Sequence, residues 1–166
     1  YSHSKYGLKY KAIYGTILHF VAQIIHFNMC FIVFREINSF SVLISVYFSF
    51  AFASGHLNHE IIDYLADKSA RIKTSAVKYG WKKSVNAILS LTLFNIVYLV
   101  TLLFVGVIDF IEFILLFTPV LIHFSIFALR RNNALQKAIS NRNWYRAMYL
   151  LSLLAIIAYR LLFNIK

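Results

Sequence analysis

Residues 85–129 read VNAILSLTLFNIVYLVTLLFVGVIDFIEFILLFTPVLIHFSIFAL and carry only two charged side chains, Asp109 and Glu112. A helix that crosses a hydrocarbon layer ~30 Å thick needs about 20 apolar residues. The stretch is long enough for two such helices, at 85–107 and 110–129, joined by a tight turn. Backbone polar groups in lipid must be satisfied within the segment, and strict strand alternation is missing here, so we expect a membrane-spanning helical hairpin.

Three further apolar segments extend this pattern outward, at 11–34, 40–54 and 147–163. The whole chain of 166 residues is 60% apolar and only 14% charged, whereas a soluble domain carries roughly a quarter charged residues. The sequence therefore predicts an all-α membrane protein with about five transmembrane helices. Pro119 is expected to kink the fourth of them. A single cysteine, Cys30, excludes a disulfide framework.

The formal charge of +11 arises from basic residues that flank the apolar segments. With five spans, every Lys and Arg except Arg35, Arg160 and Lys166 falls on one side. By the positive-inside rule this side, which includes the polar stretch 55–84, faces the cytoplasm. The basic residues thus indicate membrane topology, and we expect no nucleic-acid partner.

The polar stretch 55–84 reads GHLNHEIIDYLADKSARIKTSAVKYGWKKS. If the second helix continues through it, each residue advances by about 100°. His56, Glu60, Asp63 and Asp67 then share one face, within roughly 60° of one another. Carboxylates so placed repel one another unless a cation neutralises them, and oxygen ligands suit a hard cation such as magnesium.

Basic residues that could bind phosphate follow this face directly: Lys68, Arg71 and Lys73. Magnesium commonly takes one or two protein carboxylates and completes its shell with water and a substrate phosphate. The stretch therefore predicts a metal-bridged diphosphate site. Two alternatives stay open: a solvated helix with weak ion pairs, and a zinc site from the HxxHE order at 56–60, which differs from the HExxH pattern.

The spacing of residues 63–80 follows a longer pattern, DxxxDxxxGxxTxxVxxG. Five positions match it in register: Asp63, Asp67, Thr74, Val77 and Gly80. In this it resembles the second aspartate-rich motif of the UbiA-type intramembrane prenyltransferases, with Arg71 in place of the first glycine. The opening residues 1–9, YSHSKYGLK, are similar to the YSxPPxRLK loop that precedes the family's fifth helix.

The resemblance implies that residues 1–166 are the C-terminal part of a nine-helix bundle. The family's first motif, NxxxDxxxD, is absent from this sequence. A partner of the chain would then be the missing N-terminal half, whether the chain is a fragment or one half of a split enzyme. The stretch 55–84 would be the cytoplasmic extension that carries the second motif.

The activity implied by the resemblance is transfer of a prenyl chain from a prenyl diphosphate to a hydrophobic, commonly aromatic, acceptor. Asp63 and Asp67 would hold one magnesium ion and, with Lys73, form the catalytic set. Four further residues are expected to contact substrate: Tyr1, Lys9, Glu60 and Arg71. The apolar tail of the substrate would lie among the spans, which are also in contact with membrane lipid.

Several polar residues lie inside the predicted spans. His19, Gln23 and His26 share a face of the first span, so they could line an acceptor pocket or form interhelical hydrogen bonds. Three isolated residues are interpreted as packing partners: Asn28, Asn95 and His123. Three aromatic residues are expected to anchor the chain at the membrane interface: Trp81, Trp144 and Tyr145.

Two other functions compete with the enzyme. A transporter subunit could bind a cation on the acidic face, but transporters place ionisable residues near the membrane centre, whereas these carboxylates lie at the end of a span. A non-catalytic membrane scaffold that lacks the first motif is the other alternative.

Overall fold

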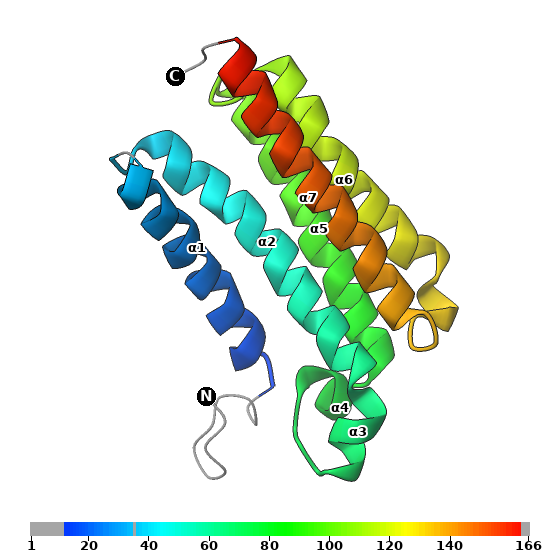
Figure 1. Ribbon diagram of the computed structural model, residues 1–166. Coiled ribbons are helices and arrows are strands. Elements are labelled where there is room, and N and C mark those ends of the chain that lie inside the picture. Colours follow the sequence, from blue (N-terminus) through cyan, green and yellow to red (C-terminus); the bar gives the residue numbers. More distant parts are fainter. Residues whose placement is uncertain (1–11, 35, 164–166) are drawn as a thin grey trace.

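The computed structural model describes residues 12–34 and 36–163, which fold into helices without any strand, as an all-α membrane protein should (Figure 1). The elements, in chain order, are α1 (Tyr14–Phe34), α2 (Ser39–Ile62), α3 (Tyr64–Ser69), α4 (Ser75–Tyr79), α5 (Trp81–Phe104), α6 (Phe110–Leu129), the short 3₁₀ helix η2 (Arg131–Asn133) and α7 (Ala138–Leu162). Within the described residues, four helices are long and apolar enough to cross a membrane: α1, α2, α5 and α6.

Two helices are much longer than the segments expected from hydropathy. The second expected segment ends at 54, whereas α2 continues to Ile62, so the first part of the polar stretch is helical as the face argument required. The expected segment 147–163 lies within the longer α7, which begins at Ala138. Hydropathy marks only the apolar part of a helix, and both helices extend beyond that part at the same polar end of the fold (Figure 1).

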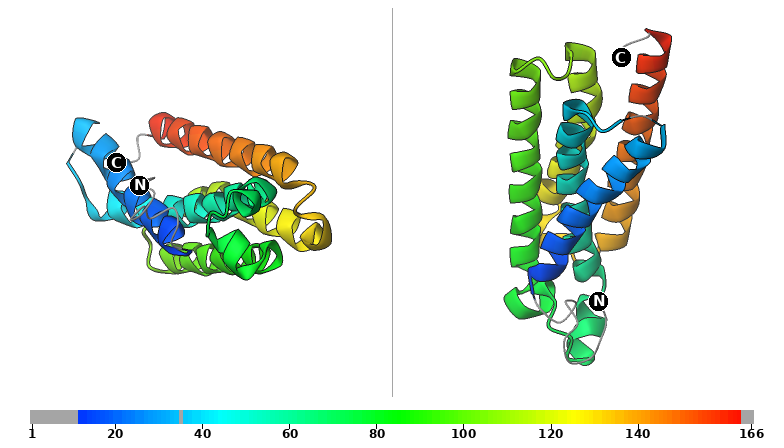
Figure 2. Two further views of the ribbon diagram at one scale, coloured as in Figure 1. Left: turned by 90° about the horizontal axis from the view of Figure 1, so that it is seen from below. Right: turned by 90° about the vertical axis from the view of Figure 1, so that its left-hand side faces the viewer.

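The helices α2, α5, α6 and α7 form a closed four-helix bundle, in which α2 packs against both α5 and α7 and α6 joins the other two. The first helix, α1, packs against α2 on the outside of this bundle. Figure 2 shows α1 crossing α2 obliquely instead of completing a ring. One face of α2 therefore lies between the neighbouring helices α1 and α7.

Pro119 lies inside α6, which continues through it from Phe110 to Leu129. A proline has no N–H, so the carbonyl of Leu115 loses its intrahelical partner. The Ser152 hydroxyl of α7 donates to this carbonyl at 2.6 Å, and the Tyr47 hydroxyl of α2 donates to the next carbonyl, that of Leu116, at 3.0 Å. These two hydrogen bonds, to carbonyls near Pro119, join α6 to α7 and α2. Lipid could not supply such donors.

The isolated polar residues of the spans are packing partners, as the sequence predicted. The Asn28 amide donates to the Ser45 hydroxyl at 3.1 Å and joins α1 to α2. The Asn95 amide donates to the Tyr47 carbonyl at 3.2 Å and joins α5 to α2. His123 is fully buried between α6 and α7.

The two ends of the bundle differ in charge. The end that carries α3, α4 and the starts of α5 and α7 holds the basic clusters at 68–83 and 130–146 (Figure 1). At the opposite end Arg160 forms an ion pair with Glu112, and the Tyr159 hydroxyl donates to Asp109 at 2.8 Å. Asp109 and Glu112 also form the capping box of α6.

Candidate functional site

A cavity of about 820 Å³ lies between α1, α2 and α7. Its wall along α2 runs from Phe48 to Asp63, about four turns or roughly 22 Å of helix. The lining positions on α2 recur every three or four residues, so they form one face of the helix. We call this space the α1–α2–α7 cavity.

On α2 and α7 the cavity lining is apolar around Phe48 and polar towards the end of α2. Aromatic and aliphatic side chains line the apolar part: Phe27, Phe48, Phe52, Leu150 and Leu153. Acidic, imidazole and guanidinium groups line the polar end: His56, His59, Glu60, Asp63, Asp67 and Arg146. The face that the sequence predicted for 56–67 is therefore a cavity wall, which argues against a simple solvated helix.

Asp63 and Asp67, the predicted metal ligands, both line this polar end. Asp63 lies between α2 and α3 as the C-cap of the first and the N-cap of the second, and its carbonyl accepts the Asp67 N–H at 2.8 Å. Asp67 is buried, at 6% exposure. Two oxygen donors on one wall fit the chemistry of a magnesium ion that completes its shell with water or phosphate. Among the residues that the structure describes, His, Cys, Asp and Glu form no metal-holding group of three or more.

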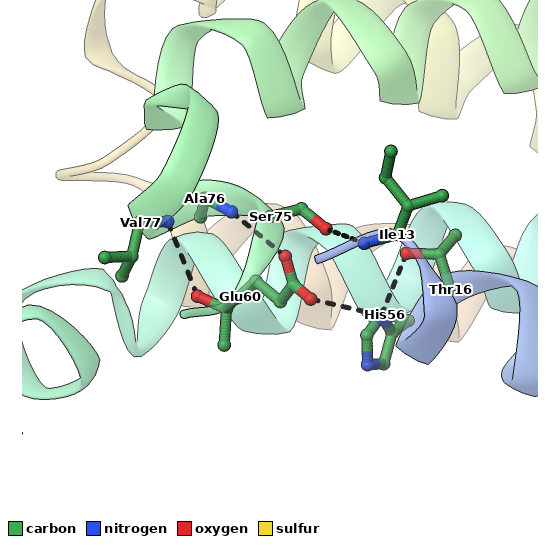
Figure 3. Close-up of polar contacts among 8 residues, drawn as sticks. Ile13, Thr16, His56, Glu60, Ser75, Ala76 and Val77 are labelled. Atoms are coloured by element: carbon green, nitrogen blue, oxygen red, sulfur yellow. Dashed lines mark hydrogen bonds and ion pairs between the residues drawn. The ribbon is translucent and has the colours of Figure 1, made fainter. Parts of the chain in front are cut away.

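Glu60 lies one helical turn away, and it is engaged with the protein itself (Figure 3). Its Oε2 accepts the Ala76 N–H at 3.1 Å, and its Oε1 lies 3.8 Å from His56 Nδ1. The residue is 8% exposed. These contacts hold α4 against α2, and the expectation that Glu60 touches substrate stays a prediction.

The remaining motif positions shape the backbone that follows the carboxylates. Arg71 has φ +57°, a left-handed conformation that favours glycine, and it stands where the motif has glycine. The Thr74 hydroxyl caps α4 by accepting the Val77 N–H at 3.4 Å. Gly80 has φ +92° and separates α4 from α5. The motif spacing thus corresponds to a turn, a helix cap and a second turn.

The predicted phosphate-binding cations lie apart from the cavity lining. Arg71 and Lys73 are exposed, and neither is among the lining residues. Tyr1 and Lys9 lie outside the described residues. A cation that the sequence reading missed, Arg146 of α7, does line the cavity. Its Nη2 lies 2.6 Å from His59 Nε2 across the space between α7 and α2.

The polar face of α1 points towards the cavity. His19, Gln23 and His26 all line it, which supports the pocket-lining alternative for these residues. The His19 ring lies against the His56 ring with centroids 4.2 Å apart. The Thr16 hydroxyl lies 3.3 Å from His56 Nδ1, so the same face also joins α1 to α2 (Figure 3).

Comparison with protein-family models, with curated proteins and with solved structures finds no match to this chain.

The expected interfacial role of Tyr145 was wrong. Tyr145 is 3% exposed, stacks on His123 at 4.3 Å and lines the cavity, whereas its neighbour Trp144 is 55% exposed. Adjacent residues on a helix point about 100° apart, so one can face the bundle while the other faces outward. Gly55 of α2 allows the close approach, because a Cβ there would lie 3.2 Å from the Tyr145 hydroxyl.

An amphiphile with an anionic head and an apolar tail matches this arrangement. The volume lies within the ~300–1,000 Å³ range of small-molecule sites. Acidic groups that can hold a cation stand on α2 and α3, and a guanidinium stands on α7. The apolar part of the lining offers aromatic rings to a hydrocarbon chain.

Proposed function

We propose that this chain contributes a magnesium-dependent diphosphate site to an intramembrane prenyltransferase. The observation that carries the proposal is the position of Asp63 and Asp67 at the polar end of a cavity that α2 and α7 line with apolar side chains at its other end. The resemblance of 63–80 to the second aspartate-rich motif of the UbiA-type enzymes supports it further, as does the left-handed turn at the motif's glycine position.

In this proposal Asp63 and Asp67 bind the metal and so orient the head of the substrate. Bound magnesium supplies charge neutralisation of the leaving diphosphate, which lowers the barrier to breaking the allylic C–O bond. The bonding electrons leave with the diphosphate, and the prenyl carbon forms its new bond to an acceptor carbon that then loses a proton. Phe48, which is buried, and Phe52 would contact the hydrocarbon part.

The other expected contacts remain proposals of the same reaction. Lys73 and Arg71 are exposed on the segment between α3 and α4, from which they would reach a phosphate at the cavity entrance. The resemblance implies that a first aspartate-rich motif, supplied by another segment or chain, holds a second magnesium. The positive-inside rule places this end of the bundle in the cytoplasm.

The proposal predicts cooperative binding of magnesium and a prenyl diphosphate, because phosphate oxygens complete the shell of the metal. Thermal unfolding in detergent should show that geranylgeranyl diphosphate stabilises the protein strongly with magnesium and weakly with excess chelator. Equal stabilisation in the two conditions would contradict a metal-bridged site.

A further inference from the structure

The start of α7 carries two guanidinium groups near the polar end of the α1–α2–α7 cavity. Arg142 and Arg146 lie one helical turn apart. Arg146 lines the cavity and contacts His59 Nε2, while the Nε of Arg142 is buried without a hydrogen-bond partner in the described part of the protein. Arg146 is exposed at the cavity wall, and Arg142 beside it is half-buried.

No carboxylate of the described residues pairs with either group. The ion pairs found there are His56 with Glu60 and Arg160 with Glu112, and the second lies at the opposite end of the bundle. Like charges one turn apart on a helix repel each other. The start of α7 therefore carries two positive charges that lack a protein counter-ion within this part of the chain.

The contact with His59 orients Arg146 without neutralising it. A guanidinium can only donate, so the Nε2 atom of His59 accepts and the imidazole is neutral. Arg146 has five N–H donors in a planar fork, and this contact uses one of them. The other donors suit an oxyanion, which a guanidinium can bind through two parallel hydrogen bonds.

We propose that Arg146, held in place by His59 and assisted by the charge of Arg142, forms an oxyanion-binding subsite on the α7 wall. This subsite is separate from the carboxylate pair on α2 and α3 and binds its ligand without a metal. Two anions share the required chemistry: the phosphate of a diphosphate leaving group and the carboxylate of an aromatic acceptor. The proposal rests on the proposed function for the choice of these two anions.

The test uses calorimetric titration of the full chain in detergent with excess chelator. Inorganic pyrophosphate is the probe in one series, and benzoate is the probe in the other. Arg146→Gln should weaken binding of at least one probe tenfold or more, about 1.4 kcal/mol. The matched control is Arg131→Gln, an exposed cation at the same end that does not line the cavity, and it should change affinity less than twofold.

The positioning role of His59 has its own readout. His59→Gln keeps an acceptor for Arg146 and should keep anion binding, whereas His59→Leu should lose it although both variants unfold at similar temperatures. Excess chelator removes magnesium from every series, so this test is independent of the magnesium site. Loss with pyrophosphate alone assigns the subsite to the leaving group, and loss with benzoate alone assigns it to the acceptor. Absence of binding to the parent, or equal losses in Arg146→Gln and Arg131→Gln, overturns the proposal.

Discussion

Arg71 stands at a motif position normally held by glycine, and its backbone conformation is one that favours glycine. Its φ of +57° places an arginine in a conformation that costs an L-residue roughly 1 kcal/mol relative to glycine. The turn between α3 and α4 requires that conformation, because the Ile72 N–H donates to the Asp67 carbonyl at 2.9 Å across it. The arginine at this position therefore adopts a backbone conformation that favours glycine.

Arg71→Gly should consequently raise the free energy of unfolding by about 0.5–1 kcal/mol. The exposed Lys73 serves as the control, because Lys73→Gly adds backbone freedom without relieving a positive φ and should lower stability. Chemical or thermal denaturation of both variants in detergent measures the difference. If the two variants lose stability to the same extent, the turn does not need a left-handed residue.

The two motif carboxylates give the residue-scale prediction for activity. Asp63→Asn and Asp67→Asn remove the charge and nearly preserve size, so turnover of the enzyme that contains this chain should fall at least ~100-fold, about 2.7 kcal/mol. Glu36→Gln, an exposed carboxylate far along the chain from the motif, should leave turnover unchanged. Parent-like activity in a folded Asp63→Asn variant would remove the central claim of the metal site.

At the scale of elements, Glu60 joins α2 to α4 through one buried hydrogen bond to the Ala76 N–H. Glu60→Gln keeps an oxygen acceptor, so it should change stability little. Glu60→Ala leaves a buried donor unsatisfied and should cost about 1–3 kcal/mol. Thermal unfolding of the two variants distinguishes a structural hydrogen bond from a requirement for the charge, which would make both variants equally unstable.

A second pair of elements, α6 and α7, is joined where Pro119 frees the Leu115 carbonyl. Ser152→Ala should cost about 1–2 kcal/mol in the parent, because that carbonyl then has no partner. Pro119→Ala restores an intrahelical N–H, so the same serine substitution should cost much less in that background. A double-mutant cycle measures the coupling, and additive effects would show that the hydroxyl is not compensating for the proline.

In the whole molecule, the cavity lies between α7 of the closed bundle and α1, which packs against α2 outside that bundle. Leu150 and Leu151 of α7 are equally exposed, at 58% each, but only Leu150 lines the cavity. Leu150→Trp should weaken binding of geranylgeranyl diphosphate tenfold or more and spare inorganic pyrophosphate, whereas Leu151→Trp should affect neither. Titrations with the two ligands check this, and equal effects of the two tryptophans would place the hydrocarbon tail elsewhere.

The helices and the acidic face of α2 can be predicted from sequence patterns, because each pattern lies within a single helix. Composition predicts helices because lipid leaves the backbone no other partner, and the 3.6-residue period places His56, Glu60 and Asp63 on one face. Hydropathy located the spans but not their polar extensions, so α2 and α7 are longer than expected. We expected the basic residues of the motif segment to bind phosphate because they directly follow the carboxylates in the sequence.

The helical fold class, the acidic face of α2 and the spacing of the turns after it can be predicted from the sequence, since each depends on residues a few positions apart. The side chains that lie opposite that face depend on how distant helices pack. Arg146 and Tyr145 are far from Asp63 along the chain, and they reach its cavity because α7 packs against α2. The period of one helix fixes which side chains share a face, whereas the packing of several helices fixes which faces meet, and that packing depends on contacts such as those around Pro119.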